Sequence, residues 1–428
     1  MSLMMDILEN LAPLNRLPCA QDYDRAVDYL RNLLTFNVID FDAAEEYNGW
    51  VIPPKCTVLE AKILKDGRLI YDGLWHPLAV IALSAAFQGR VSLAELKQHL
   101  HYDSRYRDSL TFHFRQQFRS WSRDWGFCVS RDLYDSLTEG EYEVTIRTEE
   151  EPGVMRVLEY THPGRLGETM AIYANLDHPG VANDGISGVA VGVELMKRLA
   201  EKKTKYTYRL VLAPGIVGAE YYLGRKQPAE RDSFLECLCL WMLGSRTQLA
   251  LQESRDAQSN LERALEDALR AAGTPHRRGA FESIVINDEY VWEAYGIPAC
   301  SLSRMPYPEY HSSRDSMAIM REESLSEAVD VVENAIDTLE KTLLVRRKFT
   351  GTICLSNPRY DLYVDPGQIA FGESITNERK RLRLLMDTLP TLTRPITTRA
   401  LANRVDLPEE PVVEYLQKWA DKGLIELL

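Results

Sequence analysis

The stretch that decides the fold runs over residues 169–199 and reads TMAIYANLDHPGVANDGISGVAVGVELMKRL. Its first six residues are typical of a strand, and residues 189–199 repeat apolar side chains at helical spacing. The polar segment between them is therefore expected on a strand-to-helix turn, where open α/β sheets keep their ligands. This turn carries His178 and Asp184, and imidazole and carboxylate are ligand types that hydrolytic zinc sites use.

The same alternation of strands and helices continues along most of the chain. It predicts an α/β fold in which helices flank a mixed, largely parallel sheet. We expect a first helix over residues 22–34, further core strands over 155–160, 208–212, 235–243, 283–286 and 299–302, and further helices over 187–203, 219–225, 260–272 and 324–345.

Two regions depart from this rhythm. Residues 50–146 contain short alternating segments, including a hairpin signature over 57–71, and favour a β-rich inserted domain. The last residues read as helix, tight turn, helix and strand, which is typical of a winged helix. We therefore expect an α/β domain over 1–49 and 147–349, an inserted domain over 50–146, a linker over 350–372 and a winged-helix domain over 373–428.

Composition and charge exclude several classes of protein. The 428 residues carry a net charge of −13, which argues against general binding to nucleic acid or to an anionic membrane. Seven scattered cysteines do not resemble a disulfide framework, and neither a secretory signal nor a membrane-spanning apolar run is visible. These features favour a soluble, cytoplasmic protein.

The second helix of the expected winged helix is acidic. It carries Glu409, Glu410 and Glu414 but only Lys418 as a base, which is a poor match to phosphate. We therefore expect this domain to pack against the catalytic body or a sister subunit rather than nucleic acid, and we expect a homo-oligomer.

Two later segments add further metal-type ligands, Asp288 and His311. Together with His178 and Asp184 they fit a centre of one or two zinc ions, which would lower the pKa of a bound water to about 7. Simpler roles remain open for both residues. His311 could pair with Asp315 as a loop clamp, and Asp288 could cap the helix that follows it.

These segments carry a resemblance to a known family. The segment NDGISG at 183–188, followed far along the chain by YHSSRD at 310–315, resembles the zinc aminopeptidases with co-catalytic metals. The chain is most similar to bacterial proteins that combine an aminopeptidase-like domain, a β-rich insertion and a terminal winged helix. The resemblance implies that His178, Asp184 and Asp288 hold one metal, and that Asp184 and His311 contribute to a second.

One position departs from that family. Its members usually have Pro-Glu-Thr-Ile-Gly where this chain reads PGIVG over 214–218, so Gly215 replaces an acidic residue. Glu220 and Glu289 are candidates for the missing base, although neither stands at the matching position. Arg304 and Tyr310 are candidates for substrate binding, although for an arginine a solvated or salt-bridged position is commoner.

The sequence thus leaves two functions open. The first is a zinc-dependent aminopeptidase-like hydrolase of a short peptide or small amide, impaired by Gly215. The second is a non-catalytic scaffold, descended from an aminopeptidase, that binds a metal or a ligand. A DNA-binding regulator is the least consistent with the charge.

Overall fold

The centre of the molecule is a mixed eight-stranded sheet. The computed structural model describes residues 2–257, 259–364 and 378–428. The strand order is β1 (Asn37–Asp42), β10 (Val154–His162), β12 (Thr207–Ala213), β11 (Thr169–Asn175), β13 (Phe234–Trp241), β16 (Ala299–Ser303), β14 (Leu249–Gln252) and β15 (His276–Gly279). Strands β12, β11, β13 and β16 run parallel, and antiparallel strands flank them. This confirms the expected mixed, largely parallel sheet.

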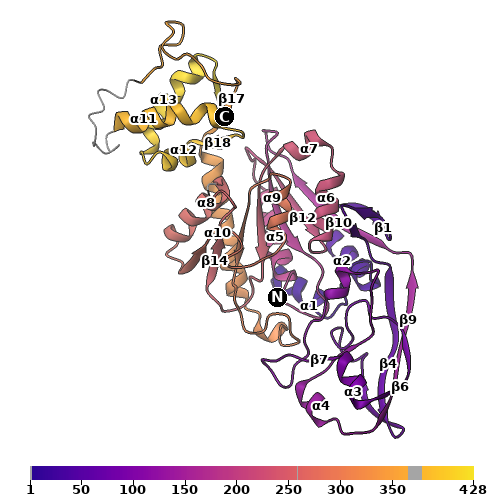
Figure 1. The fold of residues 1–428 in the computed structure, drawn as a ribbon. Helices are drawn as coiled ribbons and strands as arrows, with labels where there is room; N and C mark the ends of the chain where they lie inside the picture. The colour runs from indigo at the N-terminus through magenta and orange to yellow at the C-terminus, as the bar shows by residue number, and fades with distance from the viewer. Residues whose placement is uncertain (1, 258, 365–377) are drawn as a thin grey trace, which may run out of the picture.

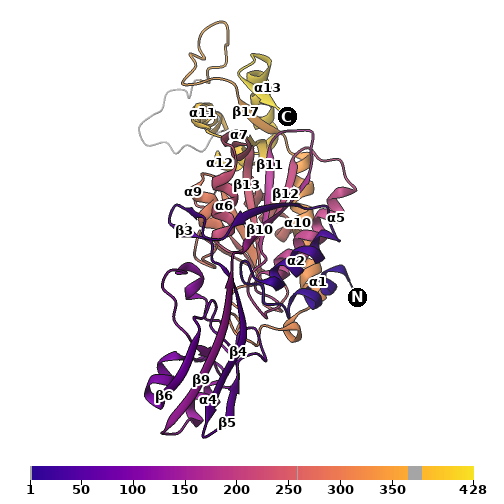
Figure 2. The ribbon, with the colours of Figure 1, turned by 90° about the vertical axis from the view of Figure 1, so that its right-hand side faces the viewer.

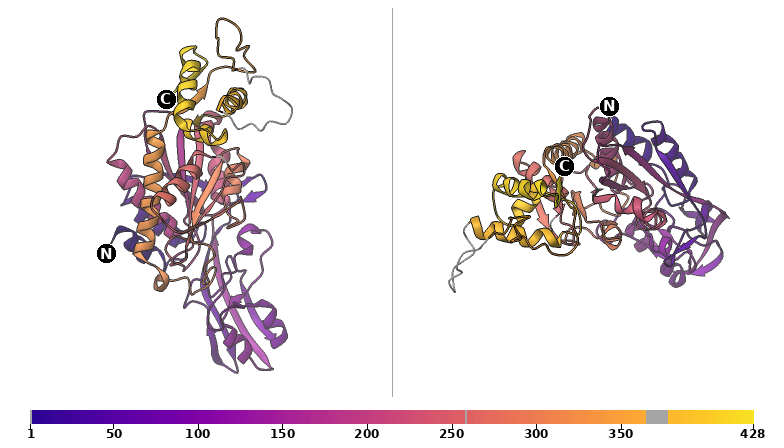
Figure 3. Two further views of the ribbon diagram at one scale, coloured as in Figure 1. Left: turned by 90° about the vertical axis from the view of Figure 1, so that its left-hand side faces the viewer. Right: turned by 90° about the horizontal axis from the view of Figure 1, so that it is seen from above.

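Helices cover both faces of the sheet because its strands are apolar on both faces (Figures 1 and 3). In β11, Ile172 and Ala174 join one buried cluster, and Ala171 and Tyr173 join the other. The first face carries α1 (Leu3–Leu11), α2 (Gln21–Arg31), α5 (Ile186–Ala200), α8 (Asn260–Ala271) and α10 (Glu322–Lys341), and the second carries α6 (Val217–Arg225) and α9 (Glu289–Ala294).

No helix in the described part of the chain is both long and apolar enough to span a membrane.

The prediction of a strand over residues 283–286 is wrong. The backbone amides of Ile284 and Val285 donate to the Gln252 side-chain oxygen at 2.9 and 3.0 Å, so a side chain satisfies them instead of a strand ladder. The edge of the sheet is instead built by β14 and β15, which the apolar pattern did not predict. Ile286 is 74% exposed, as a loop position allows.

The inserted region forms a separate four-stranded sheet. Its order is β5 (Arg68–Asp72), β4 (Lys55–Lys65), β9 (Glu141–Glu151) and β6 (Phe87–Ser92), so the predicted hairpin is confirmed. Ile63, Phe127 and Val144 lie in the core of this sheet. Figure 2 shows the long strands extending away from the α/β body, at the end opposite to the C-terminal module.

The C-terminal module has three helices and a small antiparallel sheet. They are α11 (Glu378–Thr388), α12 (Thr398–Arg404) and α13 (Glu409–Asp421), with strands β18 (Ile396–Thr397), β17 (Leu344–Arg347) and β19 (Ile425–Leu427). Strand β17 belongs to residues that the sequence assigned to the α/β domain. Its ladder partners lie some 50 and 80 residues later, so the local sequence did not reveal its place in this sheet. The winged-helix assignment stays a prediction, and residues 365–377 of the expected linker and module lie outside the described residues.

Asn260, the first residue of α8, joins the C-terminal module to the α/β body. Its side-chain oxygen accepts hydrogen bonds from the backbone amide and hydroxyl of Thr397 at 2.9 and 2.8 Å. Its side-chain amide donates to Glu236 at 2.7 Å. All three residues are buried, so this polar contact fixes the module against the body.

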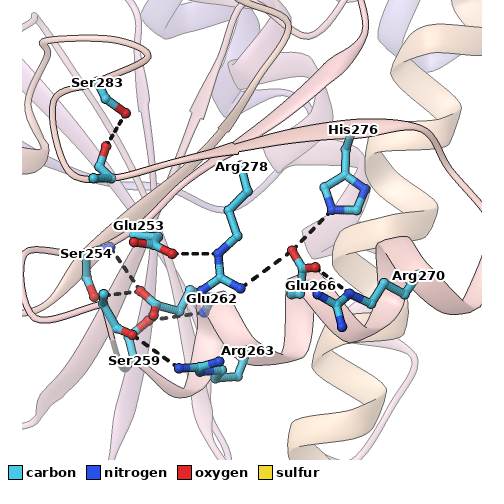
Figure 4. Close-up of polar contacts among 12 residues, drawn as sticks. Glu253, Ser254, Ser259, Glu262, Arg263, Glu266, Arg270, His276, Arg278 and Ser283 are labelled. Carbon is cyan, nitrogen blue, oxygen red and sulfur yellow. Dashed lines mark hydrogen bonds and ion pairs between the residues drawn. The ribbon is translucent and has the colours of Figure 1, made fainter.

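A polar network next to this contact ties α8 to the edge strands (Figure 4). Glu262 on α8 accepts hydrogen bonds from the amide and hydroxyl of Ser254, at 3.0 and 2.7 Å. One turn later, Glu266 contacts His276 of β15 at 3.1 Å. The edge of the sheet is therefore fixed to its helix by side chains as well as by apolar packing.

We expect Asn260→Ala to lower the free energy of unfolding by about 2 kcal/mol, because it leaves buried donors of Thr397 unsatisfied. Urea denaturation measures the change. Asn10→Ala is the matched control, since the Asn10 side chain makes one exposed hydrogen bond, and it is expected to cost less than about 0.5 kcal/mol. Equal midpoints for the two variants would contradict the docking role.

Candidate metal centre

Three side chains from two distant segments converge at the carboxyl edge of the parallel strands. His178 follows β11, Asp184 precedes α5, and His311 lies in the loop after β16. One ligand atom from each lies within 4.8 Å of the others. The prediction that His178 and His311 meet although 133 positions separate them in the sequence agrees with this geometry.

Asp184 lies at the centre of this group. Its Oδ2 atom is 3.6 Å from Nε2 of His178 and 3.2 Å from Nε2 of His311. The carboxylate is buried, and among the described residues this oxygen accepts no hydrogen bond of good geometry. Burial would raise the pKa of Asp184, but the two histidines outweigh it and hold the pKa below its usual value. An unsatisfied buried carboxylate oxygen facing two imidazole nitrogens fits a divalent cation.

Asp177 orients the first histidine. Its Oδ1 atom lies 3.1 Å from Nδ1 of His178, which leaves Nε2 directed toward Asp184. Burial lowers the pKa of His178, but the charges of Asp184 and Asp177 outweigh it and raise the pKa to about 9. Sequence reasoning overlooked Asp177, although an acid directly before a ligand histidine was visible.

Asp315 holds the turn that carries Asp184. Its carboxylate accepts the backbone amides of Ala182, Asn183 and Asp184 at 3.1, 2.6 and 3.0 Å, and the hydroxyl of Tyr307 at 2.6 Å. Burial, with the nearby charge of Asp184, raises the pKa of Asp315 to about 6. Asp315 therefore clamps the first ligand loop, whereas the imidazole of His311 faces Asp184.

Arg16 supplies a buried positive charge behind the site. Its guanidinium donates to the carbonyls of Leu176 and Val181, at 3.2 and 3.0 Å, which lie on either side of His178. Burial lowers its pKa to about 10, so it stays charged at neutral pH. No local sequence signal pointed to this role, because Leu176 and Val181 are 160 and 165 positions away.

Asp288 lies outside the group of three. Its Oδ1 atom accepts the amide of Ile216 at 2.7 Å, and its other oxygen accepts the hydroxyl of Tyr173. Burial raises its pKa to about 7. Asp288 is also the N-cap residue of α9, although its side chain makes no capping bond there. The structure thus places this predicted ligand against the Gly215 loop.

The two candidate bases point elsewhere. Glu220 accepts hydrogen bonds from Asn48 at 3.0 Å and from the hydroxyl of Tyr295 at 2.9 Å. Glu289 accepts the indole N–H of Trp241 at 2.7 Å in the interior between strands. Neither belongs to the group that faces Asp184. As bases they remain predictions that the geometry does not favour.

The two candidate substrate-binding residues differ in their surroundings. Arg304 is buried and donates to the carbonyls of Leu243 and Thr247 at 3.0 and 2.6 Å, and it also pairs with Glu327. These contacts occupy its guanidinium and give it a structural role. Tyr310 stacks on the ring of His311 with centroids 3.9 Å apart, so it lies beside the candidate centre.

A family comparison fits this geometry. Residues 5–342 match the family described as a domain of unknown function, DUF4910. The chain belongs to the DUF4910 family. A Clostridium acetobutylicum protein is 25% identical over 345 residues, 78% of this chain and 77% of that protein. Its name assigns it provisionally to polysaccharide biosynthesis and gives it an aminopeptidase-like domain.

Solved structures confirm the aminopeptidase-like fold of this DUF4910 protein. A Clostridium acetobutylicum structure, described provisionally as a peptidase, covers 99% of this chain and 96% of its own, with a TM-score of 0.75 and 20% identity. A zinc aminopeptidase from Bacillus subtilis covers 78% of this chain and 94% of its own, with a TM-score of 0.59 and 14% identity. The first structure is therefore similar along nearly the whole chain.

We expect Asp315→Ala to lower the free energy of unfolding by about 3 kcal/mol, because it leaves the buried backbone amides of Asn183 and Asp184 without an acceptor. The matched control is Asp330→Ala, whose side chain is 57% exposed and pairs with Arg198. That substitution is expected to cost less than about 1 kcal/mol. Urea denaturation of both variants tests the clamp, and similar losses would argue against it.

Proposed function

We propose that this chain binds one zinc ion through His178, Asp184 and His311, and acts as a weak hydrolase of short peptides or small amides. The observation that carries the proposal is the convergence of three ligand atoms within 4.8 Å, around a buried carboxylate oxygen that accepts no hydrogen bond of good geometry from the described residues. Two imidazoles and one carboxylate form the kind of three-residue set that catalytic zinc sites use. The aminopeptidase-like fold supports the same chemistry.

The donor set favours one ion over two. Asp288 is held by Tyr173 and the amide of Ile216, and position 215 has no side chain to contribute. When bound, zinc would polarise a carbonyl and activate water, and three protein ligands leave a position free for either. The residues of the chain bind and orient: Asp177 fixes the His178 ring, and Asp315 fixes the turn of Asp184.

The missing base limits the expected activity. Position 215 is glycine, and the carboxylates of Glu220 and Glu289 are engaged elsewhere. A positioned general base typically contributes a factor of about 10² to 10⁴ in rate. Slow turnover of amino-acid amides and dipeptides in the presence of zinc is therefore the expected behaviour.

A second candidate function rests on the same glycine. Without a carboxylate at 215, the three ligands can hold an ion while no group removes the proton of water. The protein would then be a metal-binding scaffold with a peptidase fold. Metal content does not separate the two functions, whereas restoring the acid does.

We expect Gly215→Glu to raise the turnover of amino-acid amides by on the order of 10²-fold with zinc present. A side chain at 215 would point toward Asn175 and Asp177, with its Cβ 3.0 Å from the Asn175 side-chain nitrogen, so a small shift accommodates it. Steady-state kinetics on leucine amide measures the effect.

The control for that change is Gly167→Glu. It adds the same side chain in open space beyond the other end of β11 and is expected to leave turnover unchanged. A Gly215→Glu protein that binds zinc yet gains no activity would favour the scaffold.

We expect zinc binding at pH 7 to release about one proton. His178, with a pKa of about 9, is protonated in the metal-free protein, and zinc binds neutral imidazole. The apparent affinity should therefore fall about tenfold for each pH unit below 9. Calorimetry in two buffers of different ionisation enthalpy counts the proton. An affinity that stays constant between pH 6 and pH 8 would contradict the assignment of His178.

A further inference from the structure

Both candidate ligand histidines have an unusual backbone. The φ angles of His178 and His311 are 79° and 55°, in the left-handed region. A non-glycine residue there costs about 1–3 kcal/mol and persists only where its surroundings hold it. Contacts that hold these two turns are therefore contacts that aim the two imidazoles.

The turn of His311 is held by the inserted domain. The amide of Phe112 donates to the carbonyl of His311 at 2.9 Å. On the same side, the amide of Ser313 donates to the carbonyl of Leu110 at 3.0 Å, and the amide of Leu110 donates to the hydroxyl of Ser313 at 2.9 Å. Backbone of the inserted domain therefore runs alongside the loop that carries His311. We call residues 103–114 the clasp.

Arg105 is the side chain that fixes the clasp to the loop. Its two terminal nitrogens donate to the carbonyls of Pro308 and Tyr310 at 3.1 and 2.6 Å, just before His311. The buried carboxylate of Asp103 accepts from the same guanidinium at 3.1 and 2.7 Å and so orients it. A planar guanidinium can make all four contacts at once, whereas an ammonium group cannot.

Aromatic side chains of the same segment contact the candidate ligands. The ring centroid of Phe112 is 5.3 Å from that of His178 and 5.4 Å from that of His311. The ring of Phe114 is 5.2 Å from that of His311. These contacts cover the imidazoles, whose side chains are only 15% and 22% exposed.

We infer that the inserted domain forms part of the metal site, and that Arg105 is a positioning residue that holds the loop of His311 in place for zinc binding. The inference rests on the proposed function, since it concerns the same three ligands. It assigns a role to residues 103–114, which the sequence placed in the β-rich inserted domain. Arg105 acts through the backbone of the loop and does not touch the ion.

The test compares Arg105→Ala with Arg107→Ala. Arg107 lies two residues away and pairs with Asp132 and Asp135 inside the inserted domain. The side chains of Arg105 and Arg107 are 44% and 59% exposed, so both variants are expected to fold. Zinc titration of the full chain should give a Kd about tenfold higher for Arg105→Ala and unchanged for Arg107→Ala.

A third variant separates positioning from general stability. Arg105→Lys keeps the charge but not the fork, so its zinc Kd should lie between those of the wild type and Arg105→Ala. The metal-free Arg105→Ala protein should stay folded at the temperature of the zinc titration, although its Tm falls because the buried carboxylate of Asp103 loses its partner. Zinc affinity equal to wild type in Arg105→Ala, or an equal loss in Arg107→Ala, overturns the inference.

A second readout needs no metal. Hydrogen exchange of the metal-free protein should be faster at the amides of Phe112 and Ser313 in Arg105→Ala than in Arg107→Ala, because the clasp is loosened. If the wild-type protein binds no zinc, the proposed function fails, and this measurement alone decides the inference. Equal exchange in the two variants then overturns the clasp, and faster exchange in Arg105→Ala supports it.

Discussion

The structure around the candidate metal centre depends on the buried carboxylate of Asp184, which needs positive charge or hydrogen-bond donors near it. A carboxylate out of water is costly unless positive charge or donors face it. His178 and His311 face its Oδ2 atom, and Arg16 adds a buried charge behind it. The same oxygen accepts no hydrogen bond of good geometry from the described residues. A cation between the carboxylate and the two imidazoles would satisfy these three groups, which supports the proposed metal site.

That cluster depends on two strained turns that different parts of the chain hold. Arg16, from the N-terminal segment, donates hydrogen bonds to the carbonyls of Leu176 and Val181, on either side of His178. Arg105, from the inserted domain, grips the two carbonyls before His311. Asp315 fixes the third turn through its backbone amides. Residues 103–114, which lie outside the α/β body, therefore contact the loop of His311 together with residues of that body.

Gly215 is the position at which this chain lacks the acidic residue that its resemblance to aminopeptidases led us to expect. The fold is aminopeptidase-like, and an acid at 215 would lie beside Asp177. The two acids that the sequence suggested as replacements, Glu220 and Glu289, contact Tyr295 and Trp241 instead. Under the proposed function, His178, Asp184 and His311 would hold the ion, and position 215 would supply no base.

The sequence by itself determined the local features. The apolar periods predicted most strands and helices, and the residue types at strand ends predicted His178, Asp184 and His311 as neighbours, because parallel strands end at one edge. Only the tertiary structure decided what depends on distant partners. It placed Asp288 against Tyr173, occupied Arg304 with carbonyls, and replaced the strand expected at 283–286 with amides bound by Gln252. Side-chain type and periodicity are local properties, whereas the partner of a buried charge or amide is set by contacts across the whole chain.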